Sequence, residues 1–261
     1  MPNIVVLVKQ VPDTWSERKL ADDDFTLDRE SADAVLDEIN ENAVEAGLKL
    51  KEEHGGNVTV ATIGPERAVE ALRKALSMGA DDAVILSDDA LAGSDAVQTA
   101  WALSTVIDAI GDVDVIITGN ASTDGGTGTV PAVLGVYRGL PVLTHMRSVA
   151  IDGSSVTGER ETEDGVHQLK ANLPAIVSVT EKANEPRFAS FKGIMAAKKK
   201  PVRELTLADV AAEAEQVGLE NAATSVTSAT PKPPKSAGER INDEGDAGVK
   251  LAEFLKAQKF I

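Results

Sequence analysis

The stretch Asn3-Ile4-Val5-Val6-Leu7-Val8-Lys9 decides the fold, because it is a nearly continuous run of apolar, mostly β-branched residues. A strand that is covered on both faces has this composition. A second apolar run, 57–63, ends at Gly64-Pro65, and a helical pattern over 66–78 follows it. Short apolar runs that alternate with helical patterns are typical of βαβ units. The sequence therefore predicts a parallel sheet.

The same alternation continues through the first two-thirds of the chain. Apolar residues at steps of three or four predict a helix over 31–53. Later patterns predict two more helices and four strands: helices at 94–110 and about 130–138, strands at 82–86, 113–118, 140–146 and 175–180. Asp152-Gly153 and Asp164-Gly165 lie between alternating segments and predict hairpins. The predicted fold class is α/β, a mostly parallel, doubly wound, Rossmann-like sheet with an antiparallel hairpin extension and a C-terminal arm.

The end of the chain has a different composition. Residues 225–237 are rich in Ser, Thr, Pro and Lys, as linkers are. Residues 247–256 carry apolar side chains at helical spacing. A helix this short is not stable alone in water. We therefore expect it to pack either on the body of the protein or on a partner.

The overall composition limits the classes of function. With 261 residues, 43% of them hydrophobic, the chain can bury a sizeable core. It has no cysteine, which excludes disulfides and thiolate chemistry and fits a reducing compartment. A formal net charge of −16 argues against nucleic acid as a partner. No basic leader precedes the first strand and no apolar run approaches the roughly 20 residues of a membrane span. We expect a cytoplasmic protein without membrane insertion.

The loop Gly119 to Thr129 is the strongest candidate for a binding site. It follows a predicted strand and precedes a helix, and open α/β sheets bind ligands at this edge. Its glycines allow a phosphate to approach the backbone closely, and its hydroxyl and N–H groups are donors. The loop has neither the dinucleotide fingerprint nor the lysine of a P-loop. The alternative is an ordinary flexible connection between strand and helix.

No catalytic group stands out in the sequence. The three histidines lack metal-ligand spacing; His54 and His167 suit the surface, and the place of His145 at the end of a strand suits a hydrogen bond in the core. The carboxylates have the distribution of surface charge. The sequence thus favours binding over substrate chemistry.

The segment 184–200 combines aromatic residues, an aliphatic pair and a lysine run. An apolar anchor flanked by cations suits a docking surface, although core packing beside a solvated charged face is the alternative. The blocks Asn184-Glu185-Pro186-Arg187, Ile194-Met195 and Lys198-Lys199-Lys200 resemble the signature of the electron transfer flavoprotein beta subunit. The motif Lys9 to Val11 and the block 75–81 are also similar to that family.

This resemblance implies an electron carrier rather than an enzyme. The beta subunit would pair with an electron transfer flavoprotein alpha subunit and share its FAD. It would accept electrons from acyl-CoA-type dehydrogenases, as in fatty acid beta-oxidation, and pass them toward a quinone reductase. Phe191 takes the place of the family's aliphatic docking anchor, and the implied docking residues are Arg187, Phe188, Phe191, Ile194, Met195, Lys198, Lys199 and Lys200.

The resemblance also implies an AMP site at the sheet edge. The implied residues are Leu7, Lys9, Asp37, Ile39, Asn40, Ile63, Gly119, Asn120, Ser122, Thr123, Asp124, Gly125, Gly126, Thr127, Gly128 and Thr129, with Thr14 and Ile39 near the flavin. Four residues of the loop, 125–128, depart from many relatives, which carry further acidic and Gln residues there. A second FAD, as in the bifurcating branch that Val11-Pro12-Asp13-Thr14 resembles, is the alternative ligand.

Two other readings compete with the flavoprotein reading. One is a stand-alone ATP- or AMP-binding module of the universal-stress type, and the other is an adenylate-transfer enzyme, for which a base and a phosphate-binding lysine are missing. For the flavoprotein reading we expect a nucleotide-binding domain over 1–183, a partner-recognition loop over 184–200 inserted in it, a closing segment over 201–224, and a linker with an arm that packs on the partner over 225–261.

Overall fold

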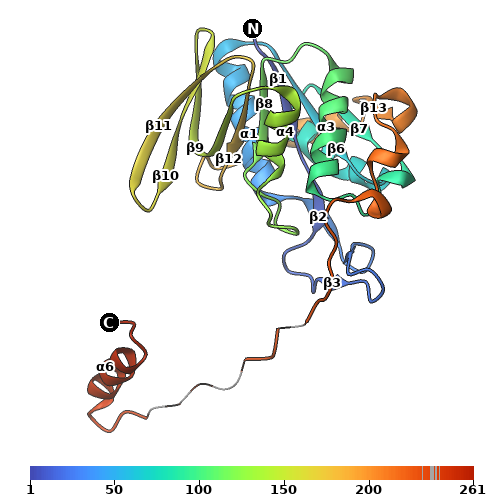
Figure 1. The fold of residues 1–261 in the computed structure, drawn as a ribbon. Coiled ribbons are helices and arrows are strands. Elements are labelled where there is room, and N and C mark those ends of the chain that lie inside the picture. The colour runs from blue at the N-terminus through green and yellow to red at the C-terminus, as the bar shows by residue number, and fades with distance from the viewer. Residues whose placement is uncertain (231, 236–237, 239, 241) are drawn as a thin grey trace. The chain divides into compact units, whose positions relative to one another are not determined.

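The computed structural model describes residues 1–230, 232–235, 238, 240 and 242–261. The chain divides into two compact units, Met1–Thr227 and Ser228–Ile261. In the first unit, nine of the described strands form one sheet in the order β11-β10-β9-β12-β8-β1-β6-β7-β13 (Figure 1). These strands are β1 (Asn3–Leu7), β6 (Asn57–Ile63), β7 (Asp82–Leu86), β8 (Val115–Gly119), β9 (Val142–Asp152), β10 (Ser155–Thr162), β11 (Gly165–Asn172), β12 (Ala175–Val179) and β13 (Val202–Leu205).

The sheet is parallel from β9 to β13, and β1 lies inside it between β8 and β6. Strands β9, β10 and β11 are antiparallel and form the extension at one edge. The predicted fold class and the two hairpins are confirmed. Strand β13, which pairs with β7, was not predicted. Its sequence, Val-Arg-Glu-Leu, is too short and too polar to give a strand signal without its neighbour.

Helices cover both faces of the parallel part of the sheet (Figure 1). Along β1, Ile4 and Val6 belong to one apolar cluster, and Val5 and Leu7 belong to the other, because successive side chains of a strand point to opposite faces. The first cluster contains residues of α1 and α2, and the second contains residues of α3 and α4. The helices are α1 (Glu38–His54), α2 (Val69–Met78), α3 (Ala96–Ile110), α4 (Val130–Arg138), α5 (Phe191–Ala197) and α6 (Ala247–Ala257).

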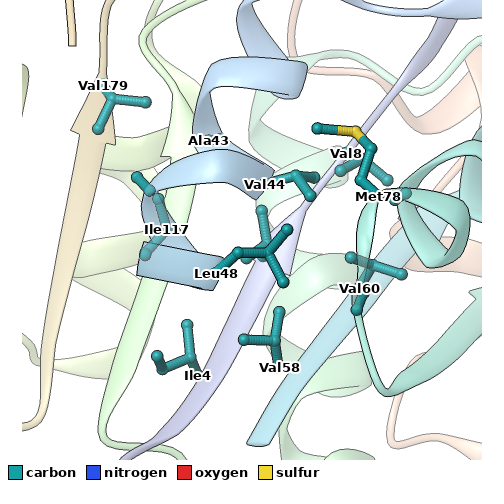
Figure 2. Close-up of a cluster of buried hydrophobic side chains, with 14 of the residues drawn as sticks. Ile4, Val8, Ala43, Val44, Leu48, Val58, Val60, Met78, Ile117 and Val179 are labelled. Carbon is teal, nitrogen blue, oxygen red and sulfur yellow. The ribbon is translucent and has the colours of Figure 1, made fainter. Parts of the chain in front are cut away.

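Figure 2 shows the first cluster, in which Val44 and Leu48 of α1 lie over the sheet. They meet apolar side chains of neighbouring strands, among them Ile4, Val58 and Ile117. Burying large aliphatic side chains stabilises the fold by about 1.5–3 kcal/mol for each. This packing fixes α1 against the middle of the sheet.

The helix predicted over 31–53 begins later than expected. Residues Ala34–Leu36 form strand β5, which pairs with β2 (Gln10–Pro12), and α1 starts only at Glu38. Asp37 is the N-cap of α1, and its carboxylate accepts a hydrogen bond from the N–H of Ile39. The prediction of a helix before Asp37 was wrong, because the apolar residues there form the short strand β5. A second small pair lies nearby, β3 (Lys19–Leu20) with β4 (Leu27–Asp28).

Other boundaries differ from the prediction by a few residues. The helix predicted over 66–78 begins with a 3-10 turn before α2, and the strand predicted over 140–146 continues into the first hairpin as the single strand β9. The five 3-10 turns in the described residues are η1 (Glu66–Ala68), η2 (Asp89–Leu91), η3 (Leu207–Asp209), η4 (Ala214–Gln216) and η5 (Leu219–Asn221).

The second unit contains α6, which was predicted over 247–256. Residues 228–230 and 232–235 of the predicted linker form neither helix nor strand; residues 231, 236 and 237 lie outside the described part. Val249, Leu251 and Phe254 of α6 are exposed, Ala247 and Leu255 are half-buried, and no residue of this fully described helix is buried. Among the described residues, no helix has the length and apolar character that crossing a membrane requires.

The packing of α1 predicts a large effect of Leu48→Ala. The Leu48 side chain is buried against the sheet, so its truncation leaves a cavity and is expected to lower the free energy of unfolding by about 2–5 kcal/mol. Denaturant unfolding measures this change. The control is Glu53→Ala on the exposed side of the same helix, where a change within about 0.5 kcal/mol is expected. Equal effects of the two substitutions would contradict this packing.

Candidate functional site

The carboxyl ends of β1 and β8 bring together the start of α1 and the loop 119–129. The Asp37 side chain is fully buried between them. One of its carboxylate oxygens, Oδ1, accepts a hydrogen bond from the Ile39 N–H at 3.0 Å. The other, Oδ2, accepts from the N–H and the hydroxyl of Thr123, at 2.6 and 2.8 Å. The same side chain therefore caps the helix and holds the loop.

Asn40 ties the first strand to the same place. Its Oδ1 accepts a hydrogen bond from the Lys9 N–H at 2.7 Å, and the Lys9 carbonyl accepts one from the Asp37 N–H at 3.0 Å. The Asn40 amide lies so close to Gly119 that a Cβ there would stand 2.6 Å from Asn40 Nδ2. A side chain at Gly119 would push Asn40 away, so glycine is needed at the end of β8.

Asp124 forms the electrostatic centre of the loop. Its buried carboxylate lies 2.9 Å from Lys9 Nζ and 2.8 Å from Arg29 Nη2. Burial disfavours the charged carboxylate, but the positive charges of Lys9 and Arg29 and the Ser122 hydroxyl outweigh burial and hold the pKa of Asp124 far below its usual range. Burial also lowers the pKa of Lys9, against the opposing effect of Asp124.

Two arginines at this edge were missed by the sequence analysis. Arg29 pairs with Asp124, and Arg18 Nη1 donates to the Thr123 carbonyl at 2.5 Å. Both come from the segment between β2 and β5, which folds back over the loop. The signal was weak, since it consisted of basic residues in an otherwise acidic segment that follows a strand end. Together with Lys9, they place three cations around the loop of an acidic protein.

The rest of the loop offers polar groups that the described residues leave available. The Asn120 side-chain oxygen is buried and has no hydrogen-bond partner among the described residues. Gly125, Gly126 and Thr127 are exposed, and Gly126 has a φ of +64°, which favours glycine. The N-cap residue of α4, Thr129, makes no side-chain cap, Pro131 has no N–H, and the Val133 N–H donates to the Thr129 carbonyl, so the N–H groups of Val130 and Ala132 are the ones that the start of α4 offers to an anion.

Of the other predicted site residues, Leu7 contributes to the core and Ile63 is half-buried at the end of β6. Ile39 is half-buried beside Gly119, and the exposed Thr14 hydroxyl donates to Glu38 Oε1 at 3.1 Å. A flavin contact of Thr14 or Ile39 stays a prediction. The loop residues Ser122 and Gly128 lie inside the cluster: Ser122 Oγ is 3.4 Å from Lys9 Nζ, and Gly128 lies against the Asn120 carbonyl.

The predicted docking residues separate into two groups. Side chains of the first group are exposed, with 96% of Phe188, 81% of Phe191 and over two-fifths of Ile194 and Met195 accessible; Lys198 and Lys199 are exposed as well. The cationic groups of the second group, Arg187 and Lys200, bind other parts of the same chain. The segment therefore shows apolar side chains outward while two of its cations point to the body.

The histidines are separate from this site. All three are exposed, so the expectation of a core position for His145 is wrong. The His145 backbone has a φ of +59°, and its N–H donates to Ser178 Oγ at 3.0 Å in the neighbouring strand. In the described part of the chain, no group of three or more acidic or histidine side chains is arranged to hold a metal ion.

Comparison with known proteins gives relatives over the whole chain. Residues 24–210 match the family described as the electron transfer flavoprotein domain. The chain is 60% identical over 266 residues to the electron transfer flavoprotein subunit beta of Mycobacterium tuberculosis (strain ATCC 25618 / H37Rv), with 100% of both chains covered. The subunit beta of Megasphaera elsdenii is 35% identical, with 99% of both covered. The caffeyl-CoA reductase-Etf complex subunit CarD of Acetobacterium woodii is 35% identical, with 91% of both covered.

The ion pairs of Asp124 predict a pH-dependent effect of Asp124→Asn. Because the folded-state pKa of Asp124 lies below its unfolded value of about 3.9, wild-type Asp124 contributes its full stabilisation above about pH 5 and loses it as pH falls below about 4. The substitution is expected to cost about 1–3 kcal/mol at pH 7. Unfolding free energies of both proteins from pH 7 to pH 3 measure this difference. A difference that does not shrink in acid would contradict the role of the charge.

Proposed function

Because this chain belongs to the electron transfer flavoprotein family as a beta subunit, we propose that it forms a heterodimer with an alpha subunit and carries electrons on a shared FAD. The family name implies an association with flavin, and the name of the subunit implies an alpha partner. The flavin supplies the redox chemistry when it is bound, while the protein supplies position and electrostatics. The chain therefore needs no substrate chemistry of its own. The lack of cysteine is consistent with work in the reducing cytoplasm.

We propose AMP as the ligand of the loop 119–129. The observation that carries this proposal is the set of cations and free donors around the loop, in a protein whose formal net charge is −16. Lys9, Arg18 and Arg29 favour an anion there, although Lys9 and Arg29 also pair with Asp124, and the start of α4 offers the N–H groups of Val130 and Ala132 to a phosphate. The buried Asn120 oxygen accepts hydrogen bonds and suits an amino group of a base or a hydroxyl of a sugar.

A second FAD is the competing ligand. The three cations around the loop, two of which also pair with Asp124, suit a diphosphate as well as a single phosphate. The exposed glycines leave the loop open on its outer side. If FAD occupied this place, the protein would be a bifurcating beta subunit.

For the electron route, we propose that acyl-CoA-type dehydrogenases bind the segment around α5 and that a quinone reductase receives the electrons. Phe188 and Phe191, three positions apart in the sequence, are both exposed. Aromatic side chains are the usual anchors of protein interfaces, whereas single exposed apolar residues need no such role. Lys198 and Lys199 add positive charge that would orient an acidic partner.

The arm fits the heterodimer better than a stand-alone nucleotide-binding module. The apolar residues Val249, Leu251 and Phe254 of α6 are exposed, and a helix of this length needs a surface to pack on. We propose that this surface belongs to the alpha subunit. A universal-stress-type module would not explain the exposed apolar side chains of α6 or the exposed aromatic side chains of 184–200.

The nucleotide content of the purified heterodimer tests the ligand. The chain is co-expressed with its alpha partner, and the complex is denatured so that released nucleotides are quantified by chromatography. One FAD and one AMP per heterodimer is the expected result. Two FAD without AMP would replace AMP by the competing ligand, and AMP or ATP on a lone chain that forms no complex would favour the stand-alone module.

Phe191→Ala tests the docking surface. The substitution removes an exposed anchor, so we expect the rate of electron transfer from an acyl-CoA dehydrogenase to fall about tenfold while the flavin content stays at the wild-type value. Stopped-flow reduction of the flavin measures the rate. The control is Val166→Ala, an equally simple truncation of an exposed apolar residue on β11. Unchanged kinetics in Phe191→Ala would remove the docking role.

A further inference from the structure

We propose that Arg187 and Lys200 are positioning residues, which hold the docking helix α5 on the body of the protein and do not themselves bind the electron donor. This inference rests on the proposed function, in which the segment around α5 receives a dehydrogenase. It assigns the two cations a role opposite to the one that the sequence suggests, since each faces inward. The two lie on either side of α5 and attach it to α1 and to the segment just after α2.

On the first side, Arg187 binds two glutamates of α1. Its Nε lies 2.6 Å from Glu45 Oε2, and its Nη1 lies 2.5 Å from Glu52 Oε1. Its Nη2 donates to both carboxylates at 3.1 Å. The Glu45 side chain is only 4% exposed, so it is not available to a partner protein; Arg187 is its nearest cation, and Lys49 of the same helix lies farther away, with Nζ 4.0 Å from Glu45 Oε1. The hydrogen bonds that Arg187 donates to Glu52 and Glu45 raise the pKa of Arg187 further above its normal value.

Amide groups reinforce this attachment. Asn42 of α1 donates from Nδ2 to the Asn184 carbonyl at 2.7 Å, and Asn184 donates from Nδ2 to the Asn42 carbonyl at 3.0 Å. Asn42 is buried, as Glu45 is. The Asn-Glu-Pro-Arg block is thus bound to α1 through both its first and its last residue, immediately before the exposed Phe188.

On the other side, the end of α5 is attached to the region of α2. Arg73 of α2 donates from Nη1 to the Ala197 carbonyl at 2.6 Å and also to the Lys200 carbonyl. The Lys200 ammonium donates to the Ala80 carbonyl, just after α2. Arg73 thus binds a carbonyl group at the end of α5, and Lys200 binds one just after the end of α2. Carbonyl groups at the end of a helix have no partner within the helix.

Between the two attachments, α5 lies directly on α2. A Cβ at Gly193 would collide with the Ser77 carbonyl oxygen, so only glycine permits this approach. The hydroxyl of Ser190 caps the helix by accepting the Gly193 N–H at 3.0 Å. With Gly193 turned to the body, Phe191 is presented outward. A partner that recruited Arg187 would have to separate it from a buried carboxylate.

A double-mutant cycle on the purified heterodimer tests the inference for Arg187. The variants are Arg187→Gln, Glu45→Gln and the double substitution, with the exposed Lys199→Gln as the matched control for loss of a surface cation. The measurements are the apparent KM and kcat for electron transfer from an acyl-CoA dehydrogenase over a range of salt concentrations. Flavin content confirms that each variant is assembled.

If Arg187 acts through Glu45, each single substitution raises KM about tenfold, and the double substitution raises it no further. The dependence of KM on salt then stays at the wild-type value. Two results would overturn the inference together: a KM in the double variant equal to the product of the two single effects, and a KM that depends less on salt than in the wild type. The second result is the one expected of Lys199→Gln. Arg187→Lys adds a second criterion, because it keeps the charge but not the bidentate geometry: a positioning role predicts loss, and wild-type KM would overturn it.

Hydrogen exchange separates this inference from the proposed function. Amide exchange of residues 188–197 is measured in the wild-type heterodimer and in Arg187→Gln, Glu45→Gln and Lys200→Gln, without any dehydrogenase. Faster exchange in all three variants, at least about tenfold, is expected. Amide exchange at the wild-type rate in the three variants would overturn the positioning role of Arg187 and Lys200, even if the kinetics with the dehydrogenase changed. If the wild-type heterodimer accepts no electrons from the dehydrogenase but the variants still show faster amide exchange, the proposed function is wrong and the positioning role of the two cations is confirmed.

Discussion

Asp37 and Glu45 are carboxylates buried at the start and in the middle of α1, and the arrangement of the surrounding segments depends on the donors that they require. An unpaired buried carboxylate costs several kcal/mol, so each must be met by groups from elsewhere in the chain. Asp37 obtains its donors from α1 itself and from Thr123, and Glu45 obtains them from Arg187. Segments that lie about 86 and 142 residues away in sequence are thereby fixed to a single helix.

The strands of the sheet could be predicted because their signal is local. A run such as Asn3–Leu7 is apolar at almost every position, and only a strand buried on both faces explains it. The start of α1 could not be predicted from spacing, because Ala34–Leu36 fits a short strand as well as a helical turn, and the pairing with Gln10–Pro12 decides between them. Asp37 was the usable signal, since an aspartate before a helical pattern is a common N-cap.

The candidate site was predictable as a place but only in part as a set of side chains. Topology brings the residues after β1 and β8 to one edge, so Lys9 and the loop after Gly119 were expected to meet there. Arg18 and Arg29 reach the loop through an irregular segment whose path depends on tertiary contacts, and no periodic pattern records that path. For the same reason the sequence shows that Arg187 and Lys200 are cations near a docking segment but not that they face inward.

Under the proposed function, the attachments of α5 explain how two phenylalanines can be kept exposed on a monomeric surface and still serve recognition. An anchor on a mobile loop loses conformational entropy when a partner binds, at roughly 0.5–1.5 kcal/mol for each side chain that is immobilised. Here the backbone that carries these side chains is already held within the folded subunit, through Arg187 on one side of α5 and through Arg73 and Lys200 on the other. Electrostatic contacts with a partner are then left to Lys198 and Lys199, which remain in water and whose attraction depends on salt. The cations of this segment therefore have two roles. Arg187 and Lys200 hold α5 on the body of the protein, whereas Lys198 and Lys199 are left for a partner.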